Sequence, residues 1–137
     1  MDTVEVGTYL NDICDNLEAG LLPDTRISLV REIDDFAIHV DHAIPIGLIV
    51  NEAVTNAVKY GFATGAEGRI VVRFRVRGGR ATLIVADDGR GFSPGRTLGI
   101  GTRMMRALAD QIDAQLRIMG RRGVVCALAF ATGQPPP

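Results

Sequence analysis

The chain has 137 residues, of which 47% are hydrophobic and 23% are charged, and its net charge is −1. This length fits one domain with a single core, and the mixed composition argues against a disordered chain. The charge gives no support for binding nucleic acid or an anionic membrane, so we expect neither as a partner. The sequence has no apolar run of about 18 residues and no leader-like start. Cys14 and Cys126 match no metal or redox spacing, so we expect a reduced, cytoplasmic protein.

Charge is distributed unevenly along the chain. Residues 1–50 hold ten acidic residues and two arginines, whereas residues 51–137 hold six acidic and thirteen basic residues. All but one of the bases are arginine, which genome composition can explain, and Lys59 is the single lysine. A basic C-terminal half suits an anionic ligand such as a nucleotide.

The first third of the chain predicts one helix and two short strands. Residues 4–22 show apolar side chains every three or four positions, which is typical of an amphipathic helix. Residues 26–32 alternate polar and apolar side chains and predict a strand. Residues 35–40 predict a second strand, and the turn residues between the two favour a hairpin.

The middle of the chain predicts the longest helix and a second pair of strands. Residues 44–60 carry one apolar stripe, and Pro45 suits the first turn of a helix. Residues 69–77 alternate apolar side chains with arginines, which predicts a half-buried strand with a solvated face. A two-glycine turn at residues 78–79 then leads into residues 81–86, a more apolar and therefore more central strand.

The last third predicts a loop, a helix and a hairpin. Residues 87–101 contain five glycines and are expected to be a loop. Residues 100–115 predict a third helix, and residues 116–119 and 124–130 predict a final hairpin.

Helices alternate with pairs of strands, and this order predicts the fold class. We expect an α+β fold, a two-layer α/β sandwich in which about three helices cover one face of a mixed, mostly antiparallel sheet. Residues 1–132 would form one domain, with the N-terminal helix in residues 1–22. Residues 133–137 would form a disordered tail.

Three side chains of the central helix could bind an ion and a phosphate. Glu52, Asn56 and Lys59 are spaced so that they lie on one helical face. Carboxylate and amide oxygens suit Mg²⁺, and the ammonium group could contact a phosphate. An ordinary solvated polar face would give the same pattern.

Two glycine-rich segments follow. The segment at residues 87–91, Asp-Asp-Gly-Arg-Gly, comes directly after an apolar strand, where an aspartate can accept a hydrogen bond from an exocyclic amine. Asp88 adds a second negative charge there. Gly99, Gly101 and Thr102 open a helix, whose free N–H groups attract anions. A plain Asp/Gly turn and a flexible loop are the alternatives.

Together, in this order and spacing, the three segments resemble the GHKL superfamily of ATP-binding domains, which includes sensor histidine kinases and gyrase-type ATPases. They look like its N box, first glycine box and second glycine box, and the resemblance spans roughly residues 40–131. Residues 44–62 are most similar to the HWE histidine kinases and their sister subfamily; the chain has no Trp, so the sister subfamily fits better. The resemblance implies the Bergerat-type ATP-binding fold.

The resemblance also implies roles for single residues. Glu52 looks like the acidic residue that polarises the attacking group, and Lys59 looks like a residue on the phosphate side; both are expected to be catalytic. Asn56 looks like the Mg²⁺ ligand, and Asp87 looks like the residue that binds the adenine amino group. The residues implied to bind the nucleotide are Asn51, Asn56, Tyr60, Asp87, Gly89, Gly91, Gly99, Gly101 and Thr102. Residues 92–98 look like a short ATP lid.

The implied function is that of the catalytic domain of a sensor histidine kinase, with ATP and Mg²⁺ as cofactors. Such a domain transfers the γ-phosphate to a histidine on a dimerisation domain, and a response regulator is the further partner. His39 and His42 lie in a strand-like stretch and are expected to be structural, so the phosphoacceptor domain is missing from this chain. Two alternatives stay open: a stand-alone serine kinase of the anti-sigma-factor type, and a non-catalytic, partner-binding GHKL module.

Overall fold

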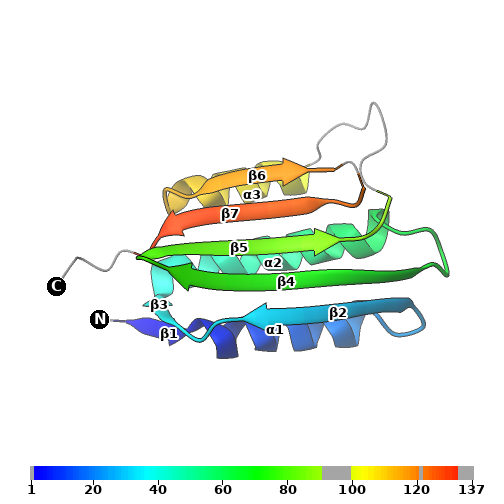
Figure 1. The fold of residues 1–137 in the computed structure, drawn as a ribbon, viewed down its shortest axis with the longest axis horizontal. Coiled ribbons are helices and arrows are strands. Elements are labelled where there is room, and N and C mark those ends of the chain that lie inside the picture. The colour runs from blue at the N-terminus through cyan, green and yellow to red at the C-terminus, as the bar shows by residue number, and fades with distance from the viewer. Residues whose placement is uncertain (1, 91–99, 121, 133–137) are drawn as a thin grey trace.

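Helices and strands form two layers, with the sheet in front of the helices in Figure 1. The computed structural model describes residues 2–90, 100–120 and 122–132. Five strands form one sheet in the order β2-β4-β5-β7-β6, and β1 and β3 form a separate two-stranded sheet. The elements are β1 (Thr3–Glu5), α1 (Val6–Leu21), β2 (Arg26–Ile33), β3 (Ala37–His39), α2 (Val40–Tyr60), β4 (Glu67–Arg77), β5 (Arg80–Asp87), α3 (Ile100–Gln111), β6 (Gln115–Met119) and β7 (Val125–Ala131). The predicted α+β sandwich of three helices on a mixed sheet is confirmed.

The core lies between the helices and the sheet. The largest fully buried side chains include Phe74 of β4 and Phe130 of β7, which face the helix layer. Strand residues alternate between this buried face and the opposite face, which we call the open face. Helix α2 lies across the middle of the sheet and supplies most of the buried helical residues, namely Ala43, Pro45, Ile46, Gly47, Ile49, Val50, Ala53, Val54 and Ala57.

The predicted hairpin between residues 26–32 and 35–40 is wrong. β3 pairs with β1, and β2 pairs in parallel with β4, with Leu29 opposite Ile70. The chain leaves the main sheet at Asp34, whose N–H still donates to the carbonyl of Phe74. The apolar face of β2 can be buried only if β2 joins the main sheet, because a two-stranded hairpin is at best marginally stable.

Helix ends differ from the prediction by up to four residues. Helix α2 begins at Val40 because His39 caps it, its Nδ1 accepting the N–H of Asp41 at 3.1 Å. Pro45 therefore lies in the second turn rather than the first, and His42 is a helical residue. Helix α3 ends at Gln111 instead of continuing to residue 115.

The open face holds a ladder of ion pairs across the parallel strands β2 and β4. Glu32 accepts a hydrogen bond from Arg73 Nε at 2.6 Å, and Arg75 contacts Glu32 and Asp34. Because Arg73 donates to it, the pKa of the Glu32 carboxyl is lowered.

Within the described residues, no helix combines the length and the apolar character that crossing a bilayer requires.

Candidate functional site

The proposed site residues gather where α2 ends, β5 ends and α3 begins, at the same end of the sandwich (Figure 1). Glu52, Asn56 and Lys59 lie along the second half of α2, as the helical spacing predicts. Glu52 and Asn56 are half-buried, whereas Lys59 is exposed. A carboxylate, an amide and an ammonium group therefore follow one another along α2, whose C-terminal end lies beside the glycine-rich segments.

Asp87 is the last residue of β5 and faces the helix layer. It pairs with the buried Ile70 of β4, so its side chain lies on the same side of the sheet as α2. Its Oδ1 accepts the N–H of Gly89 at 2.9 Å and that of Val124 at 3.3 Å. Burial raises the pKa of the Asp87 carboxyl, while these two hydrogen bonds lower it, and the raising effect is the larger.

The described residues form no hydrogen bond to Asp87 Oδ2. This second oxygen is therefore free to accept a hydrogen bond from a ligand on the helix side of the sheet. A half-buried carboxylate with one oxygen held by backbone N–H groups is rigidly oriented, as recognition of an exocyclic amine requires.

The loop after Asp87 is fixed to the end of α2. The carbonyl of Gly61, the C-cap of α2, accepts the N–H of Arg90 at 2.8 Å. A Cβ at Gly89 would overlap that same carbonyl, so only glycine permits this approach. The first two sequence motifs are thus joined by direct backbone contact.

The third motif also contacts the first. Gly101, in the first turn of α3, lies so close to Glu52 that a Cβ there would overlap Glu52 Oε1. Thr102 is buried in the same turn. The first N–H groups of α3 have no partner within the helix, so this turn places hydrogen-bond donors beside the carboxylate of Glu52.

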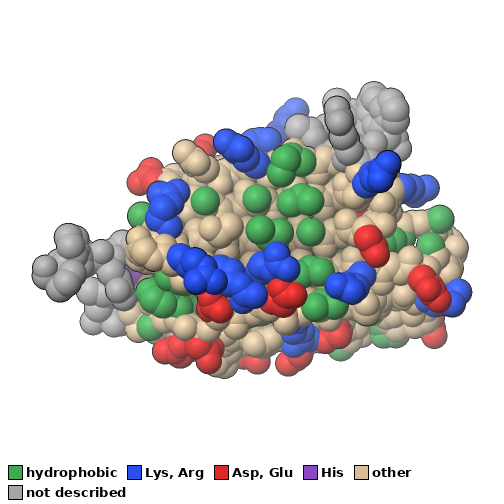
Figure 2. Space-filling model, viewed as in Figure 1, with side chains coloured by type: hydrophobic (Ala, Val, Ile, Leu, Met, Phe, Trp, Pro, Cys, Tyr) green, Lys and Arg blue, Asp and Glu red, His purple; other side chains and the backbone are tan. Residues whose placement is uncertain are grey.

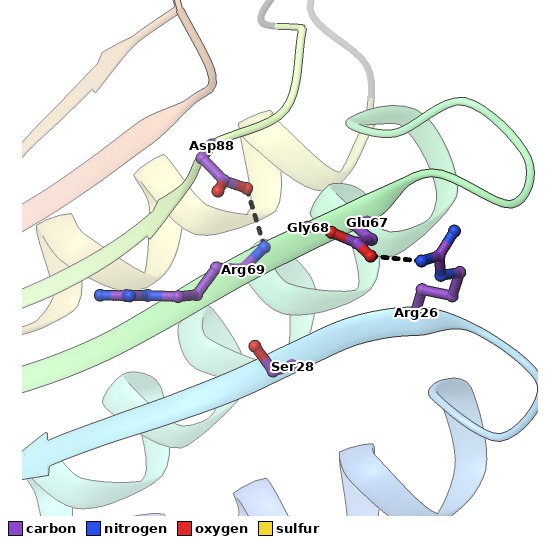
Figure 3. A pocket seen from close by; sticks show the side chains of 6 residues that line it. All are labelled: Arg26, Ser28, Glu67, Gly68, Arg69 and Asp88. Atoms are coloured by element: carbon purple, nitrogen blue, oxygen red, sulfur yellow. Dashed lines mark hydrogen bonds and ion pairs between the residues drawn. The ribbon is translucent and has the colours of Figure 1, made fainter.

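Asp88 does not share the environment of Asp87. Its side chain lies on the open face, where Oδ1 accepts the backbone N–H of Arg69 at 2.7 Å (Figure 3). A hollow of about 460 Å³ opens there, and it is lined by Arg26, Ser28, Glu67, Gly68, Arg69 and Asp88. The negative charge expected beside the adenine loop is therefore on the opposite side of the sheet.

The remaining predicted residues are placed as follows. Asn51 and Tyr60 are exposed on α2. Gly91, Gly99 and the expected lid at residues 92–98 lie outside the described residues, as does the expected tail at 133–137.

The sequence prediction missed two residues that contact Asp87. A Cβ at Gly123 would overlap the backbone carbonyl of Asp87, and Val124 supplies one of the two N–H donors. Gly123 has a φ of 84°, so a glycine is required there for conformational reasons as well. In the sequence, Gly123 falls in the turn of the predicted final hairpin, and a turn is enough to explain a glycine there. No sequence pattern linked Gly123 to the candidate site.

The oxygen atoms available here fit a magnesium ion that is held partly by the protein and partly by the phosphates of a substrate. Among the described residues no cluster of three or more His, Cys, Asp or Glu side chains could bind a metal. Mg²⁺ keeps several waters and commonly binds one or two protein oxygens together with substrate phosphates. The half-buried amide of Asn56, between Glu52 and Lys59 on α2, supplies such an oxygen.

The chain is similar in sequence to a known domain family. Residues 18–127 match the family described as histidine kinase-like ATPase domain. A blue-light-activated histidine kinase of Erythrobacter litoralis is 32% identical over 120 residues, which are 84% of this chain and 34% of that protein. The serine-protein kinase RsbW of Bacillus licheniformis is 32% identical over 109 residues, which are 66% of this chain and 68% of that protein. The chain thus spans about a third of the first relative.

Solved structures show the same architecture. The histidine kinase domain of the Erythrobacter litoralis EL346 blue-light-activated kinase aligns with a TM-score of 0.85 and 26% identity, over 96% of this chain and 63% of that one. Histidine kinase AdeS of Acinetobacter baumannii aligns with a TM-score of 0.80 at 12% identity, over 97% of this chain and 68% of that one, which shows the fold alone. The matched sequence family and the arrangement of three helices on a five-stranded sheet lead to one assignment: the chain belongs to the histidine kinase-like ATPase domains of the GHKL superfamily, an ATP-binding family.

Proposed function

We propose that this chain binds Mg·ATP and transfers the γ-phosphate to a histidine supplied by another domain or chain. The observation that carries the proposal is the meeting of three motifs at one end of the sandwich, where Gly61 contacts the Asp87 loop and Glu52 contacts Gly101. One motif alone could be an ordinary turn or polar face. Their direct contact in the fold is what a nucleotide site between α2 and α3 requires.

Each residue has a distinct role in this proposal. Asp87 Oδ2 accepts a hydrogen bond from the adenine amino group, and Gly89 keeps the loop close to α2. Lys59 and the first N–H groups of α3 stabilise the negative charge of the phosphates. Asn56 would hold Mg²⁺, which when bound neutralises charge on the phosphate oxygens.

Phosphoryl transfer needs little covalent chemistry from the protein. An imidazole nitrogen of the acceptor attacks the γ-phosphorus, the bond to the β-phosphate oxygen breaks, and ADP leaves with the electron pair. Glu52 polarises the attacking imidazole by accepting a hydrogen bond from its other N–H. The product is a phosphohistidine, so a response regulator that accepts this phosphate is the expected further partner. The two free, buried cysteines support a reducing, cytoplasmic location.

Nucleotide binding is tested first. Titration calorimetry with ADP, with and without Mg²⁺, should show an Mg²⁺-dependent gain in affinity that Asn56→Ala removes. Asn16→Ala, an exposed change on α1, is the matched control and should keep the gain. Absence of binding at about 1 mM ATP would refute the enzymatic proposal.

A second candidate is a serine kinase of the anti-sigma-factor type. It is favoured by the match to a serine-protein kinase, of which this chain covers 68%. The two kinases differ in the stability of their products. The chain is incubated with Mg·ATP and a helical acceptor carrying either one histidine or one serine; an acid-labile phosphoprotein supports the histidine kinase, and an acid-stable one supports the serine kinase.

A further inference from the structure

We propose that the open face of the sheet is a docking surface for an acidic amphipathic helix of a partner domain. The first observation is an apolar row, which we define as the five residues that the strand register aligns across the whole sheet: Val30, Val71, Ala86, Val125 and Met119. All five lie on the face opposite the helices. At a strand spacing of about 4.8 Å, the apolar row is about 19 Å wide.

This face is unusually apolar for a surface in contact with water. Antiparallel sheets that face solvent normally alternate apolar and polar side chains, whereas strands covered on both faces are almost continuously apolar. The next rung adds Ile84 of β5 and Ala127 of β7, so β5 and β7 have the pattern of strands covered on both sides. Figure 2 shows these apolar side chains together over β5 and β7.

Arginines border the apolar row on both sides, and this sets the charge of the partner. Arg69 lies beyond one side, next to Asp88. On the other side, Arg73 and Arg117 flank Ile84 and Ala127, with Glu32 beyond Arg73. Figure 2 shows the arginines in a line along β4. Arg73 is paired with Glu32, but among the described residues the guanidinium groups of Arg69 and Arg117 have no ion-pair partner. A helix with an apolar stripe flanked by Asp or Glu matches this arrangement.

A second copy of this chain does not match it. Two open faces would bring two sets of arginines together. The acidic helix α1 cannot serve either, because its apolar side is already buried in its own domain, with Leu10 and Cys14 fully buried. The occupant is therefore a different acidic segment.

The test uses a designed helical peptide of about 18 residues with a leucine stripe flanked by glutamates, and a matched peptide with lysines instead. Isotope-labelled chain is titrated with each peptide and followed by NMR. The glutamate peptide should bind at least about tenfold more tightly, with the largest shifts at Ala86, Val125 and Met119. Equal affinity for both peptides, no binding at about 1 mM, or shifts elsewhere would overturn the proposal.

Two exposed changes separate docking from folding. Arg117→Glu should weaken binding of the glutamate peptide by about tenfold, because it removes a positively charged partner of the glutamates. Met119→Lys should weaken binding by about fivefold, because it removes an apolar contact. Arg106→Glu, on the helix side, is the matched control and should change neither. All three variants should keep the affinity for Mg·ADP, so failure here is distinguishable from failure of the proposed function. Sedimentation showing a dimer that Met119→Lys dissociates would replace the helix by a second copy and overturn the proposal.

Discussion

Asp87→Asn tests the nucleotide site most directly. The asparagine oxygen can still accept the N–H groups of Gly89 and Val124, but its amide nitrogen replaces the free Oδ2. A donor then faces the adenine amino group, which is also a donor. Hydrogen bonds to charged groups contribute about 1.5–3 kcal/mol, so ADP should bind about tenfold to 150-fold more weakly.

The same change should not destabilise the fold. The pKa of Asp87 is raised by burial, so its contribution to stability is complete below the unfolded pKa and is lost as pH rises through the folded pKa. At neutral pH the buried charge therefore costs stability, and Asp87→Asn should unfold at an equal or higher temperature. Reduced affinity with unchanged stability is the expected combination.

Asp88→Asn is the matched control, because Asp88 lies on the open face and its oxygen would still accept the N–H of Arg69. Calorimetry with Mg·ADP and thermal unfolding are measured on both variants. Equal losses of affinity in the two variants, or no loss in Asp87→Asn, would refute the assignment of Asp87. A large drop in unfolding temperature for Asp87→Asn alone would refute the account of its raised pKa.

Three further outcomes follow from the structure. As the pH is lowered, the affinity for adenosine should begin to fall at a higher pH than it would with an aspartate of ordinary pKa, because the pKa of Asp87 is raised and protonation removes the hydrogen-bond acceptor. Calorimetry should find that the affinity of Asp87→Asn depends less on pH. Gly123→Ala should cost about 1–3 kcal/mol of unfolding free energy, because its φ is positive and a Cβ would overlap the backbone carbonyl of Asp87. Gly20→Ala, with open space around it, should stabilise by about 0.5–1 kcal/mol, and denaturant unfolding that ranks the two equally contradicts this packing. Burial raises the pKa of the Cys14 and Cys126 thiols to about 11, so both should react with a thiol reagent only on unfolding, and fast labelling of the native chain would be inconsistent with their burial.

Local patterns predicted most of the elements, and the reasons are visible in particular residues. The alternation in β4 and the two glycines at residues 78–79, both with positive φ, correctly placed a hairpin with β5. The partner of β2 was not predictable in this way. Its parallel pairing with β4 connects segments about 41 positions apart, and no turn residue marks such a contact.

The residues of the candidate site could be proposed from the sequence, but their arrangement in space could not. Helical spacing alone placed Glu52 and Asn56 on α2. The contacts of Gly89 with Gly61, and of Val124 with Asp87, depend on how three elements end at the same edge of the fold. Such contacts leave no periodic signal in the sequence, because a glycine that permits close approach looks the same as a glycine in a turn.

The end of β5 gives this domain two adjacent carboxylates on opposite faces of the sheet. Asp87 faces the helix side and Asp88 faces the open face, so the sheet separates the two. Coupling between nucleotide and partner would appear as a change in Mg·ADP affinity when the glutamate peptide is bound, and the affinity for the peptide must then change by the same factor when Mg·ADP is bound. Strand β5 therefore takes part in both proposed binding surfaces, one on each face of the sheet.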